Sequence, residues 1–239
     1  MALVTGRVVG TGCGGGAGVR RARGIGVRHR PRRRADGRGV HRGTGRVYSS
    51  VDIATPEACR DAVAACVQRF GRLDILVNAA GFHQMRHTTA VTDEDWDYDL
   101  AVNLNGPFYL CRAALPHLLE TAGNIVNVAS IAGVEGEVYS AGYCAAKHGL
   151  VGLTRALAIE FTKERLRVNA VCPGGMLTPQ VTEFQAPENA DYNLIMRIAA
   201  PRGMMAPVDV AKVIAFLASD DAATVHGAVY NVDNGKTAG

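Results

Sequence analysis

Apolar residues recur along this chain in two spacings that predict alternating strands and helices. Short and nearly continuous apolar runs, typical of buried parallel strands, cover residues 73–77, 124–130, 168–171 and 228–232. Between them, apolar residues recur with helical spacing over residues 56–70, 93–119, 140–163 and 207–219. Pro56 and Pro207 stand at first helical positions, and Thr92 with Asp95 resembles a capping box, so three of these helix starts carry local signals.

Strands that alternate with helices of this length indicate βαβ units and a parallel sheet. A chain of 239 residues is long enough to bury one sizeable core, so we expect a single domain over residues 1–239. The fold class predicted from the pattern is therefore α/β, with one doubly wound parallel sheet.

The pair Tyr143 and Lys147 is the first candidate for chemistry. In a helix over residues 140–163, the two side chains lie one turn apart on the same face. A lysine ammonium beside a phenol favours the phenolate, so we expect the pKa of Tyr143 to fall below about 10 and the phenol to act as a general acid and base. The alternative interpretation is a chance pair on an amphipathic helix.

Ser130 favours the catalytic interpretation. It closes the apolar run 124–130 and precedes Tyr143 by thirteen residues. We therefore expect its hydroxyl at the carboxyl end of a parallel strand, where open α/β sheets bind their ligands.

Five motifs, in order along the chain, resemble those of the short-chain dehydrogenase/reductase family, over a match from about Val47 to Gly239. They are Asn78-Ala79-Ala80-Gly81, Val102-Asn103-Leu104, Ser130 with Tyr143 and Lys147, Pro173-Gly174-Gly175-Met176-Leu177-Thr178, and Val232-Asp233-Asn234-Gly235. Two positions depart from the family pattern, since Ala79 replaces an asparagine and Asn234 replaces a glycine. On these motifs the chain is identified as a member of that family.

The resemblance implies a Rossmann-like fold and an NAD(P)-dependent oxidoreductase that interconverts a secondary alcohol and a ketone. Tyr143 would pass a proton to or from the substrate oxygen, and Ser130 would hold that oxygen. Lys147 would lower the pKa of Tyr143 and bind the nicotinamide ribose, and Asn103 would hold a water linking Lys147 to solvent. Two structural alternatives remain: Asn103 could bond backbone inside its helix, and Asn78 could support the strand and loop geometry.

The resemblance also implies a set of cofactor contacts. Asp52 and Ile53 would meet the adenine, and residues 173–178 the nicotinamide carboxamide. The whole expected set is Gly6, Gly10, Gly12, Asp52, Ile53, Asn78, Ala79, Ala80, Gly81, Tyr143, Lys147, Pro173, Gly174, Met176 and Thr178. No metal site is expected, because the six cysteines show neither Cys-x-x-Cys pairs nor the histidine spacing of a zinc site.

Residues 7–46 do not fit this pattern. Gly6, Gly10 and Gly12 match the glycine-rich turn that places a pyrophosphate at a helix N-terminus, but no helical pattern follows. The segment holds twelve Arg, twelve Gly and a single acid. Each glycine costs a helix about 1 kcal/mol relative to alanine, so the first helix and the second strand of the fold are doubtful.

We interpret the segment as the product of a compensated frameshift. One base inserted in the Gly6 codon turns the family's Gly-Ala-Ser-Ser-Gly-Leu-Gly into Gly-Arg-Val-Val-Gly-Thr-Gly, the sequence of residues 6–12. The frame returns near Arg46, since residues 48–53 again resemble the family's third strand. A genuine Arg/Gly insertion is the alternative. Read back one phase, the codons of Arg32 and Arg33 permit an aspartate, which favours NAD over NADP.

The same segment dominates the net charge. The formal charge of the chain is +4, of which residues 7–46 contribute +11, so the remainder carries −7. A basic run of this kind binds polyanions electrostatically, but it lacks the interleaved aromatic residues that stack on bases. Nucleic acid is therefore not the expected partner. A non-enzymatic polyanion-binding scaffold and a catalytically dead variant unable to bind dinucleotide remain the alternatives to an active enzyme.

The substrate is weakly encoded. We expect a lid over residues 179–205, with residues 82–87 and 132–138 as the opposite wall, and a small or medium secondary alcohol or ketone as substrate. His83 and His87 are expected to face solvent.

The family implies a homotetramer or homodimer, formed through the helices predicted at 93–119 and 140–163. A cytoplasmic location without a membrane partner is expected, because no apolar run approaches the roughly 20 residues that cross a bilayer.

Overall fold

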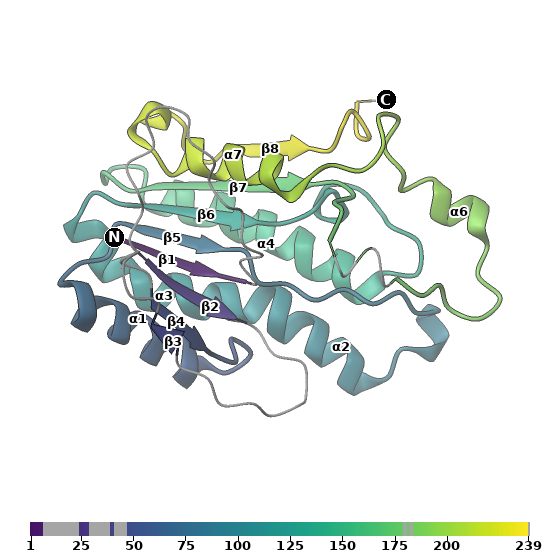
Figure 1. Cartoon of the computed structure of the whole chain (residues 1–239), viewed down its shortest axis with the longest axis horizontal. Coiled ribbons are helices and arrows are strands. Elements are labelled where there is room, and N and C mark those ends of the chain that lie inside the picture. The colour runs from purple at the N-terminus through teal and green to yellow at the C-terminus, as the bar shows by residue number, and fades with distance from the viewer. Residues whose placement is uncertain (7–23, 29–38, 41–46, 179–180, 182–183, 239) are drawn as a thin grey trace.

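An eight-stranded sheet forms the centre of the computed structural model, which describes residues 1–6, 24–28, 39–40, 47–178, 181 and 184–238 (Figure 1). The strand order is β3-β4-β2-β1-β5-β6-β7-β8. The strands are β1 Ala2–Thr5, β2 Gly24–Arg28, β3 Gly39–Val40, β4 Val47–Ser50, β5 Ile75–Asn78, β6 Asn124–Val128, β7 Arg167–Pro173 and β8 Val229–Val232. All neighbours are parallel except β3, which runs antiparallel to β4 at the edge. The predicted doubly wound parallel sheet is confirmed.

The helices follow the predicted segments closely. They are α1 Pro56–Phe70, α2 Asp93–Leu100, α3 Gly106–Glu120, α4 Ala141–Glu160, α6 Tyr192–Met196 and α7 Pro207–Leu217. Three short 3-10 turns cover Thr88–Ala90, Ile131–Gly133 and Asp220–Ala222. Pro56 and Pro207 do begin their helices, and the Thr92 side chain accepts a hydrogen bond from the backbone N–H of Asp95, as the capping signal predicted.

The single helix predicted over residues 93–119 is wrong in its middle, where a π-helical turn at Ala101–Asn105 separates α2 from α3. The side chain of Asn103 explains the break. Its Nδ2 donates at 3.0 Å to the carbonyl of Asp99, the acceptor that the Asn103 backbone N–H would use in an α-helix. Such π-turns are frequent at functional sites.

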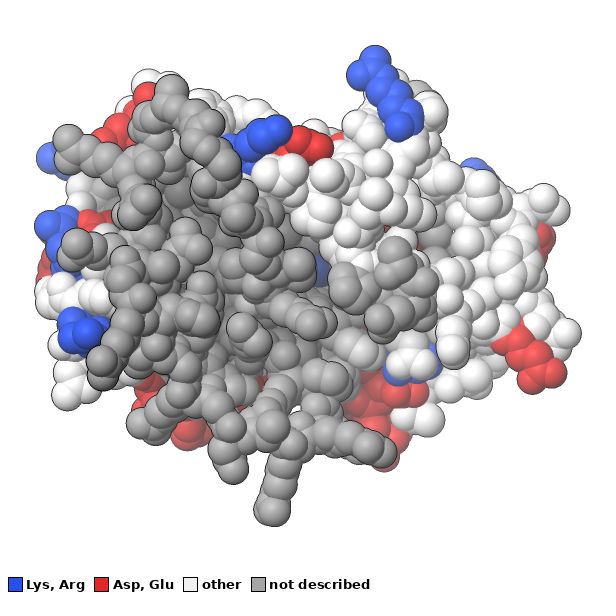
Figure 2. Space-filling model, viewed as in Figure 1, with Lys and Arg blue, Asp and Glu red and all other residues white. Residues whose placement is uncertain are grey.

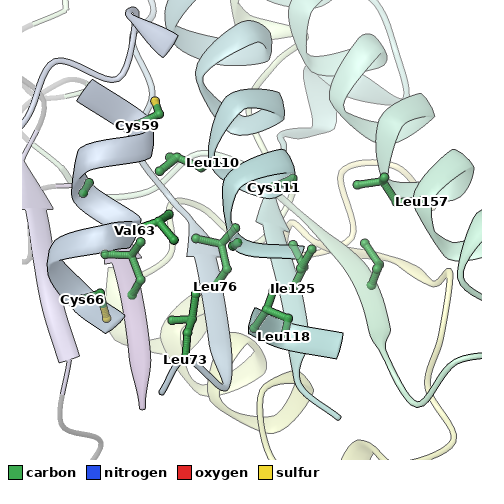
Figure 3. Packing of buried hydrophobic residues seen from close by; sticks show 14 of the residues in the cluster. Cys59, Val63, Cys66, Leu73, Leu76, Leu110, Cys111, Leu118, Ile125 and Leu157 are labelled. Atoms are coloured by element: carbon green, nitrogen blue, oxygen red, sulfur yellow. The ribbon is translucent and has the colours of Figure 1, made fainter. Parts of the chain in front are cut away.

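The core lies on both faces of the sheet. On one face, α1, α3 and α4 pack against β1, β5 and β6, with Val63, Leu76, Leu110 and Ile125 all 2% exposed or less (Figure 3). On the other face, α7 packs against Val77 and its neighbours. Leu76 and Val77 are adjacent in β5 and enter opposite clusters, because successive side chains of a strand point to opposite faces.

The N-terminal region corrects one expectation. The second strand, which the Arg/Gly composition made doubtful, forms as β2 and pairs in parallel with both β1 and β4. Sheet pairing uses backbone groups, which any non-proline residue of this strand supplies. The first helix, Gly10, Gly12, Arg32 and Arg33 lie outside the described residues.

Charges of both signs are interspersed among the described residues of the face in Figure 2. Here and elsewhere, exposed charges of the described residues form ion pairs, such as Arg60 with Glu57 at 2.7 Å and Lys212 with Asp209 at 2.9 Å. Pairs of this kind contribute little to stability. No helix in the described part of the chain is both long and apolar enough to span a bilayer.

Candidate active site

The predicted catalytic residues meet beyond the carboxyl end of β6. Ser130 is 8% exposed, and its Oγ accepts a hydrogen bond from the Ala132 N–H at 3.1 Å, which caps the 3-10 turn Ile131–Gly133. This turn lies directly on α4, because a Cβ on Gly133 would stand 2.7 Å from the Lys147 carbonyl oxygen. The close approach, possible only with glycine, brings the Ser130 hydroxyl into hydrogen-bond contact with the Tyr143 hydroxyl.

Lys147 is buried beneath this pair, at 3% exposure. Its Nζ donates at 3.0 Å to the carbonyl of Val128 and lies 5.6 Å from the centroid of the Tyr143 ring. Burial lowers the pKa of the Lys147 ammonium to about 8. The structure thus brings Ser130, Tyr143 and Lys147 together, as the helical spacing and the strand end predicted.

The pKa of Tyr143 departs from the sequence expectation. Burial raises it above the usual range, and the hydrogen bond with Ser130 offsets only part of that rise. The charge of Glu137 raises it further. The expected lowering by Lys147 is therefore wrong for the structure described here. Desolvation of the phenolate is the largest effect on this pKa, and the phenol holds its proton at neutral pH.

Asn103 is fully buried and uses its side-chain amide to hold a neighbouring loop. Its Oδ1 accepts from the Phe82 N–H at 3.1 Å, and its Nδ2 donates to the Phe82 carbonyl at 2.8 Å. Together with the bond to Asp99, these contacts match the structural alternative of an amide bonded to backbone. They fix the residues that follow Gly81 beside the catalytic group.

His83 is a site residue that the sequence analysis missed. It was expected to face solvent, yet its ring centroid lies 4.3 Å from that of Tyr143, and its Nε2 lies 2.9 Å from Ser140 Oγ. Burial, with the charges of Lys147 and Arg86, lowers the pKa of His83 to about 4, so the ring is neutral. The sequence analysis placed its loop, 82–87, in the wall of the site but gave the histidine itself no contact there.

His87 was also expected to face solvent and instead joins three segments around the site. Its ring packs edge-on against Tyr139 at 4.8 Å, and its Nε2 lies 2.8 Å from the Glu188 carbonyl. The hydroxyl of Tyr139 accepts from the Asp191 N–H at 2.9 Å. The described part of the predicted lid is therefore tied to the loop 82–87 of the predicted opposite wall, and to Tyr139, one residue beyond its other segment, 132–138.

Gly6 and Gly81 follow the ends of β1 and β5, on the expected path of the dinucleotide. Gly6 has a φ of +110°, and a Cβ there would stand 2.9 Å from the Ala79 carbonyl oxygen. The Thr5 hydroxyl accepts from the backbone N–H groups of Ala79 and Ala80, which joins the ends of β1 and β5. A Cβ on exposed Gly81 would reach within 3.6 Å of the Lys147 ammonium. These close approaches fit a cofactor that lies along the strand ends and reaches Lys147.

Other expected cofactor residues have structural roles. The Asn78 side chain points inward, and its Nδ2 donates to Asn127 Oδ1 at 2.8 Å. This contact matches the structural alternative, in which Asn78 supports the strand and loop geometry. Ile53 is fully buried in the core against Gly106, which leaves only its backbone for an adenine contact. Asp52 is exposed, and its Oδ1 accepts from the Ala54 N–H at 3.0 Å.

The predicted nicotinamide segment follows β7 and is anchored from two sides. The Gly174 N–H donates to the Val232 carbonyl at 2.9 Å, and the Leu177 N–H to the Met205 carbonyl at 2.9 Å. Pro173 is buried, while Met176 and Thr178 are partly exposed. The departure Asn234 has a φ of +56°, a left-handed conformation that asparagine tolerates better than most residues, so the turn forms without the family's glycine.

Comparison with known proteins agrees with this geometry. The family model described as enoyl-(acyl carrier protein) reductase matches residues 25–237, from an earlier start than the motifs indicated. A protein of Penicillium canescens named short-chain dehydrogenase/reductase is 37% identical over 201 residues, which cover 78% of each chain. The meso-2,3-butanediol dehydrogenase of Serratia marcescens is 38% identical over 188 residues, 79% of this chain and 74% of that one.

The cyclohexanol dehydrogenase of Acinetobacter sp. (strain SE19) is 39% identical over 191 residues, which cover 79% of this chain and 74% of that one. Similarity of this extent, with the family model matched over most of the chain, decides the assignment. The chain belongs to the short-chain dehydrogenase/reductase family of NAD(P)-dependent oxidoreductases.

Proposed function

We propose that this protein interconverts a secondary alcohol and a ketone, with Tyr143 as the group that transfers the proton. The observation that carries the proposal is the contact between the Ser130 and Tyr143 hydroxyls above a buried Lys147 ammonium. Two hydroxyls in contact can hold one substrate oxygen between them, and only one of them needs to exchange a proton.

The raised pKa of Tyr143 sets the direction of easy proton transfer. A phenol that holds its proton at neutral pH is a general acid, so it donates to the oxygen that gains negative charge during ketone reduction. Alcohol oxidation requires the reverse: the O–H and C–H bonds of the alcohol break, the C=O bond forms, and the proton passes to Tyr143. Oxidation is therefore favoured by higher pH.

Bound NAD(P) supplies the hydride acceptor or donor for this reaction. Among the described residues, Gly6, Ala79, Ala80 and Gly81 would line its path, and Lys147 would bind the nicotinamide ribose hydroxyls. Residues 173–178 would meet the carboxamide. The choice between NAD and NADP rests on the codon argument alone, which favours NAD.

Asn103 has a positioning role in this proposal. Its amide is committed to Phe82 and Asp99, so it holds the Gly81 turn and the His83 ring against the catalytic residues. A relay water, if Lys147 exchanges protons through one, would then be held by backbone groups of the π-turn rather than by this side chain.

The proposed substrates are small or medium secondary alcohols and ketones. The relatives named for butanediol and cyclohexanol support this size class. Around the site, the exposed side chains of the lid region are mixed in character, with Phe184 and Tyr192 beside Glu188 and Asp191.

We also propose that the chain is a homo-oligomer assembled through α2, α3 and α4. These helices carry large apolar side chains that remain exposed in the single chain: Trp96 at 39%, Phe108 at 38% and Ile159 at 76%. Light scattering coupled to size-exclusion chromatography tests this, and a monomer at micromolar concentration would contradict it.

The experiment for the proposed function is a fluorescence titration of the purified chain with NADH and NADPH, followed by turnover of simple secondary alcohols. Saturable binding with turnover that is lost in Tyr143→Phe supports the proposal, and the tighter cofactor identifies the preference. A folded protein that binds neither dinucleotide supports the dead-variant alternative. Salt-sensitive RNA binding without turnover supports the polyanion-binding scaffold.

A further inference from the structure

Glu137 is a carboxylate fixed beside the catalytic tyrosine that the proposed reaction does not use. It lies in the loop between the Ile131–Gly133 turn and α4. Its backbone is fastened to the residue that follows Tyr143: the Glu137 N–H donates to Cys144 Sγ at 3.3 Å, and that thiol lies 3.8 Å from the Glu137 carbonyl oxygen. These bonds hold the Glu137 backbone at the first turn of α4, and the charge of Glu137 acts on the Tyr143 phenol.

Within the described part of the chain, the Glu137 side chain makes neither a hydrogen bond nor an ion pair, although it is partly buried. The neighbouring Glu135 differs, because its Oε1 pairs with Lys236 Nζ at 2.6 Å. Burial first, and the charge of Glu135 second, raise the pKa of Glu137 to about 7, against a smaller opposing effect of Lys236. A desolvated carboxyl without a partner, in a reaction centre, is typical of a group that binds substrate.

The second unused group is the His83 ring on Tyr143. Ser140 Oγ donates its single proton to the Val138 carbonyl at 3.0 Å, so it can only accept from His83 at the 2.9 Å contact. The proton of the neutral imidazole is therefore on Nε2, and Nδ1 is left as a hydrogen-bond acceptor. In the described residues, no donor reaches this Nδ1.

The two unused groups thus share one chemical character, since both accept hydrogen bonds. The His83 ring packs on Tyr143, and Glu137 is held by the next residue, Cys144, and acts on the phenol through its charge. We propose that Glu137 and His83 recognise a hydroxyl group on the carbon next to the reacting one, so that the preferred substrates are vicinal diols and the matching α-hydroxy ketones. This inference rests on the proposed function, since it names the substrate class of the same site.

The charges around the site determine which chemical group is accepted on the carbon next to the reacting one. A substrate carboxylate would be repelled by Glu137 and by the nearby Glu135. An ammonium would be attracted by Glu137 but repelled by the positive charges of Lys147 and Arg86, both of which act on His83. A neutral hydroxyl donates a hydrogen bond to either acceptor without these repulsions, so it is the group that fits.

The test compares four substrates that carry different groups near the reacting carbinol carbon: a hydroxyl, no polar group, an amine or a carboxylate. They are meso-2,3-butanediol, 2-butanol, 3-amino-2-butanol and 3-hydroxybutyrate. With the preferred dinucleotide, kcat/KM for the diol should exceed that for 2-butanol by about 10- to 100-fold, as expected for a hydrogen bond to a charged group. Preference for the amino alcohol or the hydroxy acid, or equal use of diol and 2-butanol, overturns the inference.

Variants at the two neighbouring glutamates separate recognition from folding. Glu137→Gln should reduce the diol-to-alcohol ratio to below about threefold, because the amide is a weaker acceptor than a carboxylate. The matched control, Glu135→Gln, removes a carboxylate from the same loop. At pH 9, where Glu137 is ionised in the parent and in this control, the control should keep the ratio of the parent. A ratio that falls equally in both variants, or in neither, overturns the role of Glu137.

The pH dependence of the diol preference distinguishes substrate binding by Glu137 from a purely structural role of this residue, which would leave that dependence unchanged. In the parent, kcat/KM for the diol relative to 2-butanol should rise as the pH increases through about 7, when Glu137 loses its proton. In Glu137→Gln this relative rise should vanish. Glu135 and Lys236 act on Glu137, and the titratable groups that act on the phenol of Tyr143 are Glu137, Cys144 and Cys172. The profile is therefore compared with that of Glu135→Gln.

Failure of the proposed function is distinguishable from failure of this inference. If no alcohol is turned over, the proposed function is wrong, and hydroxyl recognition is read from thermal unfolding with each ligand at 100 mM. A rise in Tm with the diol but not with 2-butanol, present in the parent and in Glu135→Gln and absent in Glu137→Gln, supports recognition. Equal Tm shifts for the two ligands overturn it.

Discussion

Lys147 carries an ammonium that the fold buries, so its replacement by methionine should stabilise the protein while abolishing catalysis. The side chain is 3% exposed and keeps one hydrogen bond, to the Val128 carbonyl at 3.0 Å. Burial lowers its pKa from 10.5 to about 8. At about 1.4 kcal/mol per pH unit, this difference corresponds to about 3 kcal/mol of lost folding free energy when the group is charged.

The pH dependence follows from the sign of this pKa change. Below about pH 8 both the folded and the unfolded chain carry the ammonium, and the folded chain bears the whole cost of burying it. Between about pH 8 and pH 10.5 the unfolded chain binds more protons than the folded chain, so the contribution of Lys147 to stability improves as the pH rises. Above that window neither state is charged and the cost is gone.

The free energy of unfolding of Lys147→Met, relative to that of the parent, should therefore be about 3 kcal/mol higher at pH 7 than at pH 10.5. Changes in packing that do not depend on pH cancel in this double difference. Urea unfolding of both proteins at the two pH values measures it. The control is Lys212→Met, whose lysine side chain is 72% exposed and should give no such difference. If Lys147→Met changes the free energy of unfolding equally at both pH values, the reasoning that burial lowers the pKa of this lysine is refuted.

Three other perturbations have definite outcomes. Tyr143→Phe should lower kcat by about 10²- to 10⁴-fold, a far larger factor than any change in dinucleotide affinity, and a loss of affinity as large as the loss of kcat would contradict its role as proton donor. With the parent enzyme, kcat for alcohol oxidation should rise between pH 7 and pH 10, because the pKa of Tyr143 is raised, and a flat profile with chemistry rate-limiting would contradict that. Gly6→Ala should lower the free energy of unfolding, measured in urea, by about 2–4 kcal/mol, since the φ is +110° and the new Cβ would stand 2.9 Å from the Ala79 oxygen. The neutral control is Gly136→Ala, where a Cβ meets nothing within 4 Å.

The periodic pattern determined the fold class and most of the elements by itself. Helix α1 begins and ends where its apolar spacing and Pro56 placed it, and β5 to β8 coincide closely with the apolar runs. Local signals suffice there because a helix or strand buries the face that its own sequence makes apolar. The catalytic set was predictable for the same reason, since Tyr143 and Lys147 share one helix face and Ser130 ends a strand.

Tertiary structure decided what depends on neighbours distant in the chain. The π-turn at Asn103 arises from a side chain that takes a backbone acceptor and also holds Phe82 on another loop. His83 contacts Tyr143 only because that loop folds back over α4, so no spacing rule could place it. The direction of the Tyr143 pKa change also belongs to this level, because its largest cause is burial in the assembled site, which the spacing of Tyr143 and Lys147 does not show.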